Sequence, residues 1–213
     1  AWAVMAGKTA EEARRMLEQT YFVSPSRAAL AAETGGTAAE AARGLEPRDI
    51  AVYIGIPFCP TRCAYCSFVS QSVEKSFSLM APYVDALVDE IRTGGEMVRR
   101  QGLRVRALYM GGGTPTTLTA KQLNRVLAAF AESFDAAACS EITVEAGRPD
   151  TITAEKLAVL KARGVTRVSV NPQTMEDRVL RAIGRNHTAG DIARAMDLTA
   201  QYGFSHVNMD LIA

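Results

Sequence analysis

The amino-acid sequence predicts an α/β fold built on a parallel sheet. Three observations predict it: five short apolar, β-rich runs, helical patterns between them, and their spacing. Successive runs start between 26 residues (141 to 167) and 56 residues (51 to 107) apart, which leaves room for a crossover helix. The expected strands are residues 51–56, 107–110, 141–146, 167–171 and 206–212. The expected helices are residues 81–100, 120–134, 154–162, 175–183 and 191–202.

The region before the first strand is expected to stand apart from the sheet. Residues 8–32 carry a helical pattern that Pro25 must interrupt, because proline has no backbone N–H to donate in a helix interior. Residues 33–48, with their Gly35-Gly36 pair, are typical of a linker. Residues 1–48 are therefore predicted to be a short helical segment and linker, the tail of a preceding region.

Two local signals qualify the long helix expected over residues 81–100. Pro82 suits an opening turn, where the missing N–H costs nothing. The Gly94-Gly95 pair predicts a weak or kinked point, because glycine is a poor helix former. The apolar stripe that should face the sheet is Val84, Leu87, Val88 and Ile91.

The last predicted strand, residues 206–212, is apolar on both faces apart from His206, Asn208 and Asp210. Such a strand belongs in the middle of a parallel sheet, covered on both sides. The sequence continues with neither a covering helix nor a sixth strand. We therefore expect residues 49–213 to be a core that is C-terminally incomplete, truncated after its fifth strand.

Composition and charge narrow the class of protein. The 213 residues are 48% hydrophobic and 22% charged, as in an ordinary globular domain. The net charge of +1, from 24 basic and 23 acidic side chains, gives no reason to expect nucleic acid or an anionic membrane surface as a partner. No apolar run approaches the roughly 18 residues of a membrane-spanning helix. We expect a cytoplasmic protein.

Three of the four cysteines lie close together, directly after the first predicted strand. Cys59, Cys63 and Cys66 have the spacing C-x3-C-x2-C. Such clustering without a secretion signal indicates a metal or redox site rather than a disulfide. Three thiolates are one short of the usual four, so a cubane iron–sulfur cluster held there would keep one iron open.

Two simpler interpretations of the cysteine cluster compete with an iron–sulfur site. One is a zinc site completed by Cys139, His187 or His206, and the other is three buried thiols. Cys139 precedes the third predicted strand, where we expect a small core residue. Neither histidine has a partner at metal-ligand spacing, so both are expected to be structural or solvated, with His187 a weak candidate near a substrate.

The cysteine loop, with Tyr65 before its last cysteine, resembles the signature of the radical S-adenosylmethionine (SAM) superfamily. The surrounding run, Tyr53-Ile54-Gly55-Ile56-Pro57-Phe58-Cys59-Pro60, is similar to the oxygen-independent coproporphyrinogen III oxidase group, in its coproporphyrinogen dehydrogenase branch. The resemblance covers about residues 50–213. It implies a partial parallel (β/α) barrel, open on one side, with a [4Fe–4S] cluster on the three cysteines and SAM on the open iron.

The resemblance also assigns the SAM-binding residues. The glycine run 111–113 alone indicates only a tight turn after the second strand, but within the family it contacts the methionine part of SAM. Polar residues at or beyond later strand ends can bond ribose hydroxyls or the SAM carboxylate. The residues implied are Tyr53, Tyr65, Gly112, Gly113, Thr114, Glu145, Gln173, Arg185 and Asp210. No catalytic residue is implied beyond the cluster and SAM.

The implied activity belongs to heme biosynthesis. A 5′-deoxyadenosyl radical would take hydrogen from a propionate of coproporphyrinogen III, and loss of carbon dioxide and an electron would leave a vinyl group. Two such steps give protoporphyrinogen IX and need an external electron donor and acceptor. Substrate propionates would need basic contacts, for which Arg62, Arg148 and Arg185 are candidates. The alternatives are a heme chaperone on the same core and a zinc-stabilised α/β domain.

Overall fold

The computed structural model describes residues 2–68 and 70–212. Contacts divide the chain into two compact units, Ala1–Pro47 and Arg48–Ala213. The described part of the first unit consists of helices α1 (Trp2–Met5), α2 (Ala10–Thr20) and α3 (Pro25–Ala41). Pro25 occupies the first turn of α3, so the predicted interruption separates two helices.

The predicted linker over residues 33–48 is wrong in its first half, because α3 continues through Gly35-Gly36 to Ala41. The buried residues of α3 are Ala28, Ala32 and Gly35, which lie on one helical face. Small side chains on that face let α3 pack closely against α2. The glycine pair therefore serves helix packing here and does not end the helix.

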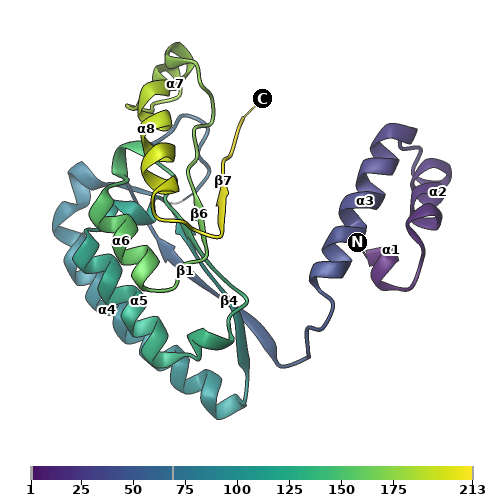
Figure 1. Cartoon of the computed structure of the whole chain (residues 1–213), viewed down its shortest axis with the longest axis horizontal. Coiled ribbons are helices and arrows are strands. Elements are labelled where there is room, and N and C mark those ends of the chain that lie inside the picture. Colours follow the sequence, from purple (N-terminus) through teal and green to yellow (C-terminus); the bar gives the residue numbers. More distant parts are fainter. Residues whose placement is uncertain (1, 69, 213) are drawn as a thin grey trace. The chain divides into compact units, whose positions relative to one another are not determined.

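The second unit contains the predicted parallel sheet (Figure 1). Its five strands lie in the order β1-β4-β5-β6-β7, and every neighbouring pair is parallel. Their bounds are β1 (Asp49–Ile56), β4 (Arg104–Gly112), β5 (Glu141–Glu145), β6 (Arg167–Ser169) and β7 (His206–Asn208). A small second sheet, β2 (Phe58–Cys59) with β3 (Gln71–Ser72), was not predicted. The α/β class and the five parallel strands are confirmed.

The strand predicted over residues 206–212 is shorter and more exposed than expected. Only His206–Asn208 form β7, which is last in the strand order, and Val207 and Leu211 are exposed to solvent. Beyond β7, the chain meets the sheet again through a single bridge between Gln173 and Leu211. The apolar pattern indicated a covered central strand, whereas one neighbour pairs with this segment in the described chain.

Helices cover one face of the sheet (Figure 1). They are α4 (Val73–Gln101), α5 (Ala120–Ser133), α6 (Ala154–Ala162), α7 (Asp177–Ala182) and α8 (Ala189–Ala200). Short 3-10 turns lie at Pro115–Thr117, Ala136–Ala138 and Pro149–Thr151. Strand alternation directs side chains such as Ile54, Leu108 and Val144 into the core shared with α4 and α5.

Two expectations for the first long helix are wrong. The helix α4 begins at Val73, so Pro82 lies inside it, and its non-helical residue is Ser76 rather than Gly94-Gly95. A Cβ at Gly95 would lie 2.6 Å from the Ser133 backbone oxygen of α5. Gly95 is therefore a point of close approach between α4 and α5 where only glycine fits, which explains its place inside the helix.

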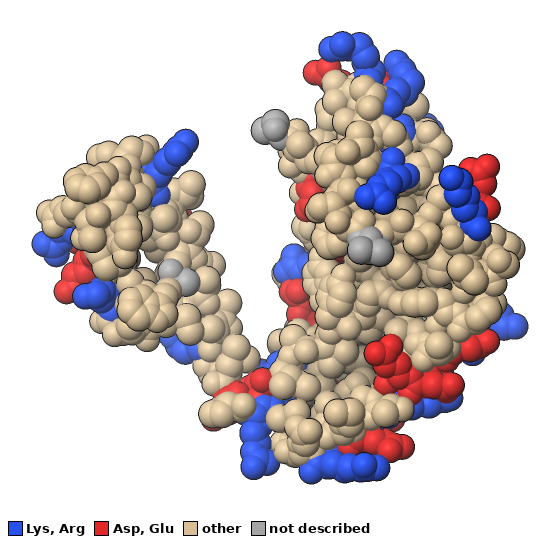
Figure 2. Space-filling view, turned by 180° about the vertical axis from the view of Figure 1, so that it is seen from behind, with Lys and Arg blue, Asp and Glu red and all other residues tan. Residues whose placement is uncertain are grey.

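The surface of the core carries both signs of charge. Figure 2 shows basic and acidic side chains interspersed over the face of the second unit that it displays. Within the described residues, no helix has the length and apolar character needed to span a membrane.

Candidate cluster and SAM site

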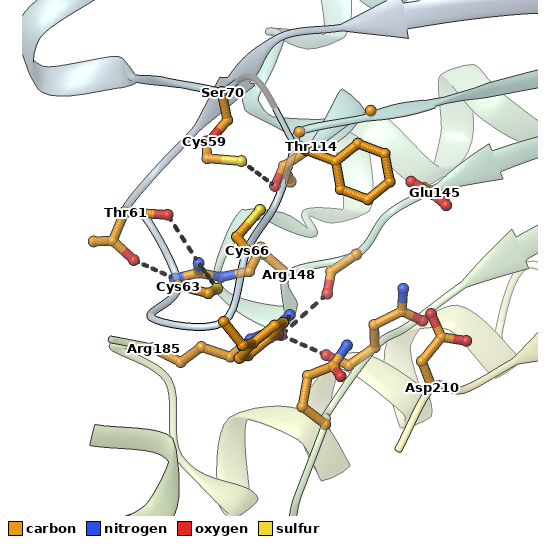
Figure 3. A pocket seen from close by; sticks show the side chains of 17 residues that line it. Cys59, Thr61, Cys63, Cys66, Ser70, Thr114, Glu145, Arg148, Arg185 and Asp210 are labelled. Atoms are coloured by element: carbon orange, nitrogen blue, oxygen red, sulfur yellow. Dashed lines mark hydrogen bonds between the residues drawn. The ribbon is translucent and has the colours of Figure 1, made fainter. Parts of the chain in front are cut away.

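One pocket at the carboxyl ends of the strands gathers almost all of the predicted site residues (Figure 3). Parallel strands place their carboxyl ends at one edge of a sheet, so residues distant in sequence meet there. The predicted residues that line the pocket are Cys59, Cys63, Tyr65, Cys66, Gly112, Gly113, Thr114, Glu145, Gln173, Arg185 and Asp210. Tyr53 lies outside it and lines an adjoining cavity.

The cysteine loop is held at both of its ends and in its middle. The N–H of Gln71 donates to the Pro57 carbonyl at 2.7 Å, which closes the loop beside the β2–β3 pair. Inside the loop, the Thr61 hydroxyl donates to the Gly184 carbonyl at 2.6 Å, and the Ala64 N–H donates to the Ile183 carbonyl at 3.0 Å. The loop is thus fixed to the turn after α7.

The glycine run after β4 lies against this cysteine loop. The N–H of Gly113 donates to the Ile56 carbonyl at 2.7 Å. A Cβ at Gly113 would lie 2.9 Å from the Cys59 sulfur, so the two segments can approach only because the residue is glycine. The Thr114 hydroxyl lies 3.4 Å from the same sulfur. Burial raises the pKa of the Cys59 thiol, although Thr114 and Arg148 act against it.

Two carboxylates face the pocket from neighbouring parts of the sheet edge. Glu145 ends β5 and accepts a hydrogen bond from the Tyr109 hydroxyl of β4. Burial raises the pKa of Glu145, and the charge of Asp210 raises it further, while the bond from Tyr109 lowers it. A group with hydroxyl donors placed beside Glu145 would stabilise its charged form. This arrangement suits the ribose of SAM.

Arg185 is a buried residue that lines the pocket and follows the turn after α7. Its Nη1 donates to the Asn171 carbonyl at 2.6 Å, and its Nη2 lies 3.2 Å from the Tyr65 hydroxyl. Gln173 reaches the pocket from a left-handed backbone conformation, with φ of 68°. A non-glycine residue in that conformation is strained, so its side chain is retained for some other reason than backbone geometry.

The proposed zinc ligands are not gathered at the pocket. Cys139 precedes β5 and His206 begins β7, so both lie at the amino ends of the strands, across the sheet from the cysteine loop. Cys139 is half-buried against the core, as predicted. His187 is buried, with Nδ1 3.5 Å from the Asp150 carboxylate. Among residues 2–68 and 70–212, no three His, Cys, Asp or Glu side chains already stand as a closed metal-ligand set.

Sequence reasoning missed five residues that line the pocket and misjudged Arg148. The five are Thr61, Phe68, Ser70, Gly147 and Asn171. Asn171 lines the pocket, and the only signal for it was its place just before Gln173 at a strand end. Arg148 was considered for substrate contact, but its guanidinium is buried and bonded to the cysteine loop. Arg185 is also buried, whereas Arg62 is exposed.

Comparisons with known proteins indicate the same family as the residues of the pocket. The model of the Radical SAM superfamily matches residues 53–213. The oxygen-independent coproporphyrinogen-III oxidase-like protein HemZ of Bacillus subtilis is 38% identical over 98% of this chain and 42% of its own length. The heme chaperone HemW of Lactococcus lactis is 34% identical over 75% of this chain and 40% of its own length. The chain thus spans less than half of these relatives.

A solved structure confirms the fold. The coproporphyrinogen III oxidase HemN of Escherichia coli, a radical SAM enzyme, superposes with a TM-score of 0.69 and 29% identity. The superposition covers 81% of this chain and 39% of HemN. Radical SAM proteins use a [4Fe–4S] cluster and SAM, and these are the cofactors of this chain.

The pocket has the donors and acceptors that these cofactors need. Two buried pocket atoms, Oδ1 of Asn171 and Nε of Arg185, have no hydrogen-bond partner among the described residues. One is an acceptor and the other a donor, so together they complement an amino group and a carboxylate, such as those of the methionine part of SAM. With three thiols in the same pocket, the residues fit both cofactors. The chain therefore belongs to the radical SAM superfamily, in its coproporphyrinogen III oxidase group.

Proposed function

We propose that this chain is the cofactor-binding core of an oxidoreductase that converts propionate side chains of coproporphyrinogen III into vinyl groups. Each conversion removes one hydrogen atom from the β-carbon, releases carbon dioxide and passes one electron to an acceptor. Two conversions give protoporphyrinogen IX. When bound, the cluster and SAM supply one-electron SAM cleavage and hydrogen-atom abstraction, and an external donor provides the electron.

One observation carries the proposal: a second cavity adjoins the cofactor pocket. It has a volume of about 710 Å³ and shares Phe68, Gly112, Gly113 and Glu145 with the pocket. This size is within the range of small-molecule sites. A substrate in the cavity would lie against the cofactor without entering its pocket, which is the geometry that hydrogen-atom abstraction requires.

The walls of this cavity favour a large and largely apolar substrate. The rings of Tyr53 and Tyr109 stack with centroids 6.0 Å apart and an interplanar angle of 12°. They are 59% and 40% exposed, so a substrate in the cavity can contact them. Aromatic faces of this kind suit pyrrole rings. The chain's own residues thus orient the substrate, while Glu145 and Arg185 position SAM.

A second candidate function is heme binding without turnover. The heme chaperone of Lactococcus lactis matches three quarters of this chain. The oxidase-like relative of Bacillus subtilis, however, matches 98% of it, including the helical residues 2–47 that precede the sheet. The longer match favours the oxidoreductase.

The deciding experiment is an anaerobic assay of the natural full-length product that contains this chain. Reconstituted protein is incubated with coproporphyrinogen III, SAM and a reductant, and the porphyrins are separated after oxidation. Protoporphyrin and the monovinyl intermediate should accumulate, with 5′-deoxyadenosine formed in step. The Cys63→Ala variant is the matched control and should form neither product. Tight heme binding with no decarboxylation, in protein that carries its cluster, would instead establish the chaperone.

A further inference from the structure

A buried polar network lies directly behind the cysteine loop. Arg148 follows β5, immediately before the turn Pro149–Thr151, and is 2% exposed. Asp150 lies within that turn, and His187 lies in the loop before α8. An arginine stays protonated in proteins, and burying its charge is costly unless it is paired. The position of Arg148 therefore needs an explanation from its contacts.

The guanidinium of Arg148 reaches the cysteine loop on one side. Its Nη2 donates to the Thr61 hydroxyl at 3.0 Å, and its Nη1 lies 3.4 Å from the Thr61 carbonyl oxygen (Figure 3). The same Nη1 lies 3.7 Å from the Cys63 sulfur, within hydrogen-bond range for sulfur. One fixed fork thus contacts both the backbone of the loop and one of the three thiols.

On its other side, the guanidinium of Arg148 lies beside a carboxylate that balances part of its positive charge. Nε of Arg148 lies 3.3 Å from Asp150 Oδ1, which is also 3.5 Å from His187 Nδ1. Burial alone would raise the pKa of Asp150, but the nearby His187 imidazole and the charge of Arg148 outweigh it, so the pKa is lowered. The side chain of Asp150 is 28% exposed and pairs with Nε of Arg148, whereas Nη1 and Nη2 make the contacts to the loop.

We infer that Arg148 is a positioning residue that also sets the reduction potential of the cluster. The inference rests on the placement of the cluster on Cys59, Cys63 and Cys66. Hydrogen bonds and positive charge beside a cluster thiolate favour the more negative, reduced cluster. Arg148 supplies both at Cys63, and Asp150 opposes part of the charge. The cluster of this chain is therefore easier to reduce than that of a chain with a neutral residue at 148.

The test compares variants of the reconstituted full chain by redox titration, followed through the paramagnetic signal of the reduced cluster. Arg148→Met removes the positive charge and the hydrogen-bond donors, so the midpoint reduction potential of the cluster should become more negative. Arg148→Lys keeps the charge without the fork and should shift less. Arg163→Met is the control, because this exposed arginine at the end of α6 contacts Asn124 and loses the same charge. It should leave the midpoint unchanged.

A second variant covers the case in which Arg148→Met fails to fold or retain iron. Asp150→Asn removes the opposing negative charge and keeps every contact of Arg148 with the loop, so its midpoint should shift to a less negative potential. Unchanged midpoints in Arg148→Lys and Asp150→Asn, with normal iron content, would overturn the inference. No porphyrinogen enters this measurement, so failure of the proposed decarboxylation is a separate outcome. If the wild-type chain takes up no iron, the placement of the cluster on the three cysteines is itself wrong.

Discussion

The two sides of the sheet differ in how firmly they are built and in what they contribute to the site. On one side, β1 and β4 pair along their length from Asp49 to Ile56 and carry the cysteine loop and the glycine run. On the other, β6 and β7 pair only from Arg167 to Ser169, and Gln173, Arg185 and Asp210 follow them. The firm side carries the cysteine loop and the glycine run to the pocket, and the thin side presents polar side chains to the same pocket.

The two sides also differ in the residues that occupy their sterically restricted backbone positions. Beside β1, glycine is used where no side chain fits, as at Gly113. Beside β6, Gln173 keeps a long side chain in a left-handed conformation that glycine would adopt without strain. Shape therefore decides the residue at Gly113, whereas at Gln173 a requirement other than backbone geometry decides it.

The largest expected effect tests the firm side at its thiols. Replacing Cys59, Cys63 or Cys66 with Ala should reduce the iron content from about four per chain to almost none, because a three-ligand site has no spare anchor. Iron and sulfide analysis of anaerobically prepared protein measures this. Cys139→Ala, at the opposite edge of the sheet, should keep its full iron content. A Cys63→Ala chain that retains four irons would contradict the assignment.

A smaller effect, on the free energy of unfolding, is expected at the glycine run. In Gly113→Ala, the new Cβ would meet the Phe58 carbonyl at 2.7 Å and the Cys59 sulfur at 2.9 Å. Overpacking of this kind costs about 1–3 kcal/mol, and here it also displaces a cluster ligand. Urea unfolding of the iron-free protein should show the loss. The matched control is Gly94→Ala in α4, where the nearest atom is 3.8 Å away, and a gain of about 0.5–1 kcal/mol is expected.

Glu145, at the end of the central strand β5, should respond to replacement by Gln in opposite ways with and without SAM. The folded-state pKa of Glu145 is raised, so its contribution to stability is present at acid pH and is lost as the pH rises through that value. The SAM-free variant should therefore be more stable than wild type at neutral pH. Loss of a charged acceptor should weaken SAM binding roughly 10- to 100-fold, at about 1.5–3 kcal/mol.

The control for this pH dependence is Glu141→Gln at the other end of β5. A hydrogen bond from Arg167 lowers the pKa of Glu141, so this carboxylate stabilises the fold above its unfolded pKa and loses that effect in acid. Its removal should destabilise the chain at neutral pH and leave SAM affinity unchanged. Thermal unfolding across pH, with calorimetric titration of SAM, measures both variants. Equal shifts in the two would show that the environment of Glu145 is not distinctive.

The smallest effect is expected for Gln173→Gly. Relief of the left-handed backbone should stabilise the SAM-free chain by about 1 kcal/mol, and loss of the side chain should weaken SAM binding about tenfold. Phe22→Gly is the control, since Phe22 has φ of 53° in the other unit and should gain stability without any change in SAM affinity. Unchanged SAM binding in Gln173→Gly would mean that the strained side chain does not contact the cofactor.

The sequence predicted the fold well where one local signal dominated, and poorly where a proline or glycine signal was outweighed by the surrounding helical pattern. The alternation of strands and helices was clear because apolar runs repeat with turns between them, and the predicted bounds of α6 coincide with those observed. Pro82 misled because proline favours the first helical turn, yet here it lies within α4. Gly35-Gly36 misled because glycine in a helix interior is unfavourable alone and is retained where helices pack closely.

The candidate site was predicted chiefly through its motif, and the structure adds the contacts between segments. The positions of the cysteine loop and glycine run followed from their places after β1 and β4, and the structure brings Gln173, Arg185 and Asp210 to the same pocket. The roles of these residues stay predictions. The Arg148 network could not be predicted, because the distance between residues 61 and 148 in the sequence gives no sign of their contact.

The contact between the cysteine loop and the turn before Arg185 has a thermodynamic consequence. The Thr61 hydroxyl donates to the Gly184 carbonyl and the Ala64 N–H donates to the Ile183 carbonyl. A Cβ at Gly184 would lie 2.8 Å from the Arg62 carbonyl oxygen. Two segments held this closely cannot order independently, so with the cluster on the cysteine loop and SAM at Arg185, as proposed, the two cofactors would be linked ligands. By reciprocity, the factor by which the cluster raises the affinity for SAM is the factor by which SAM raises the affinity for the cluster. We expect SAM to protect the iron of this chain against chelators.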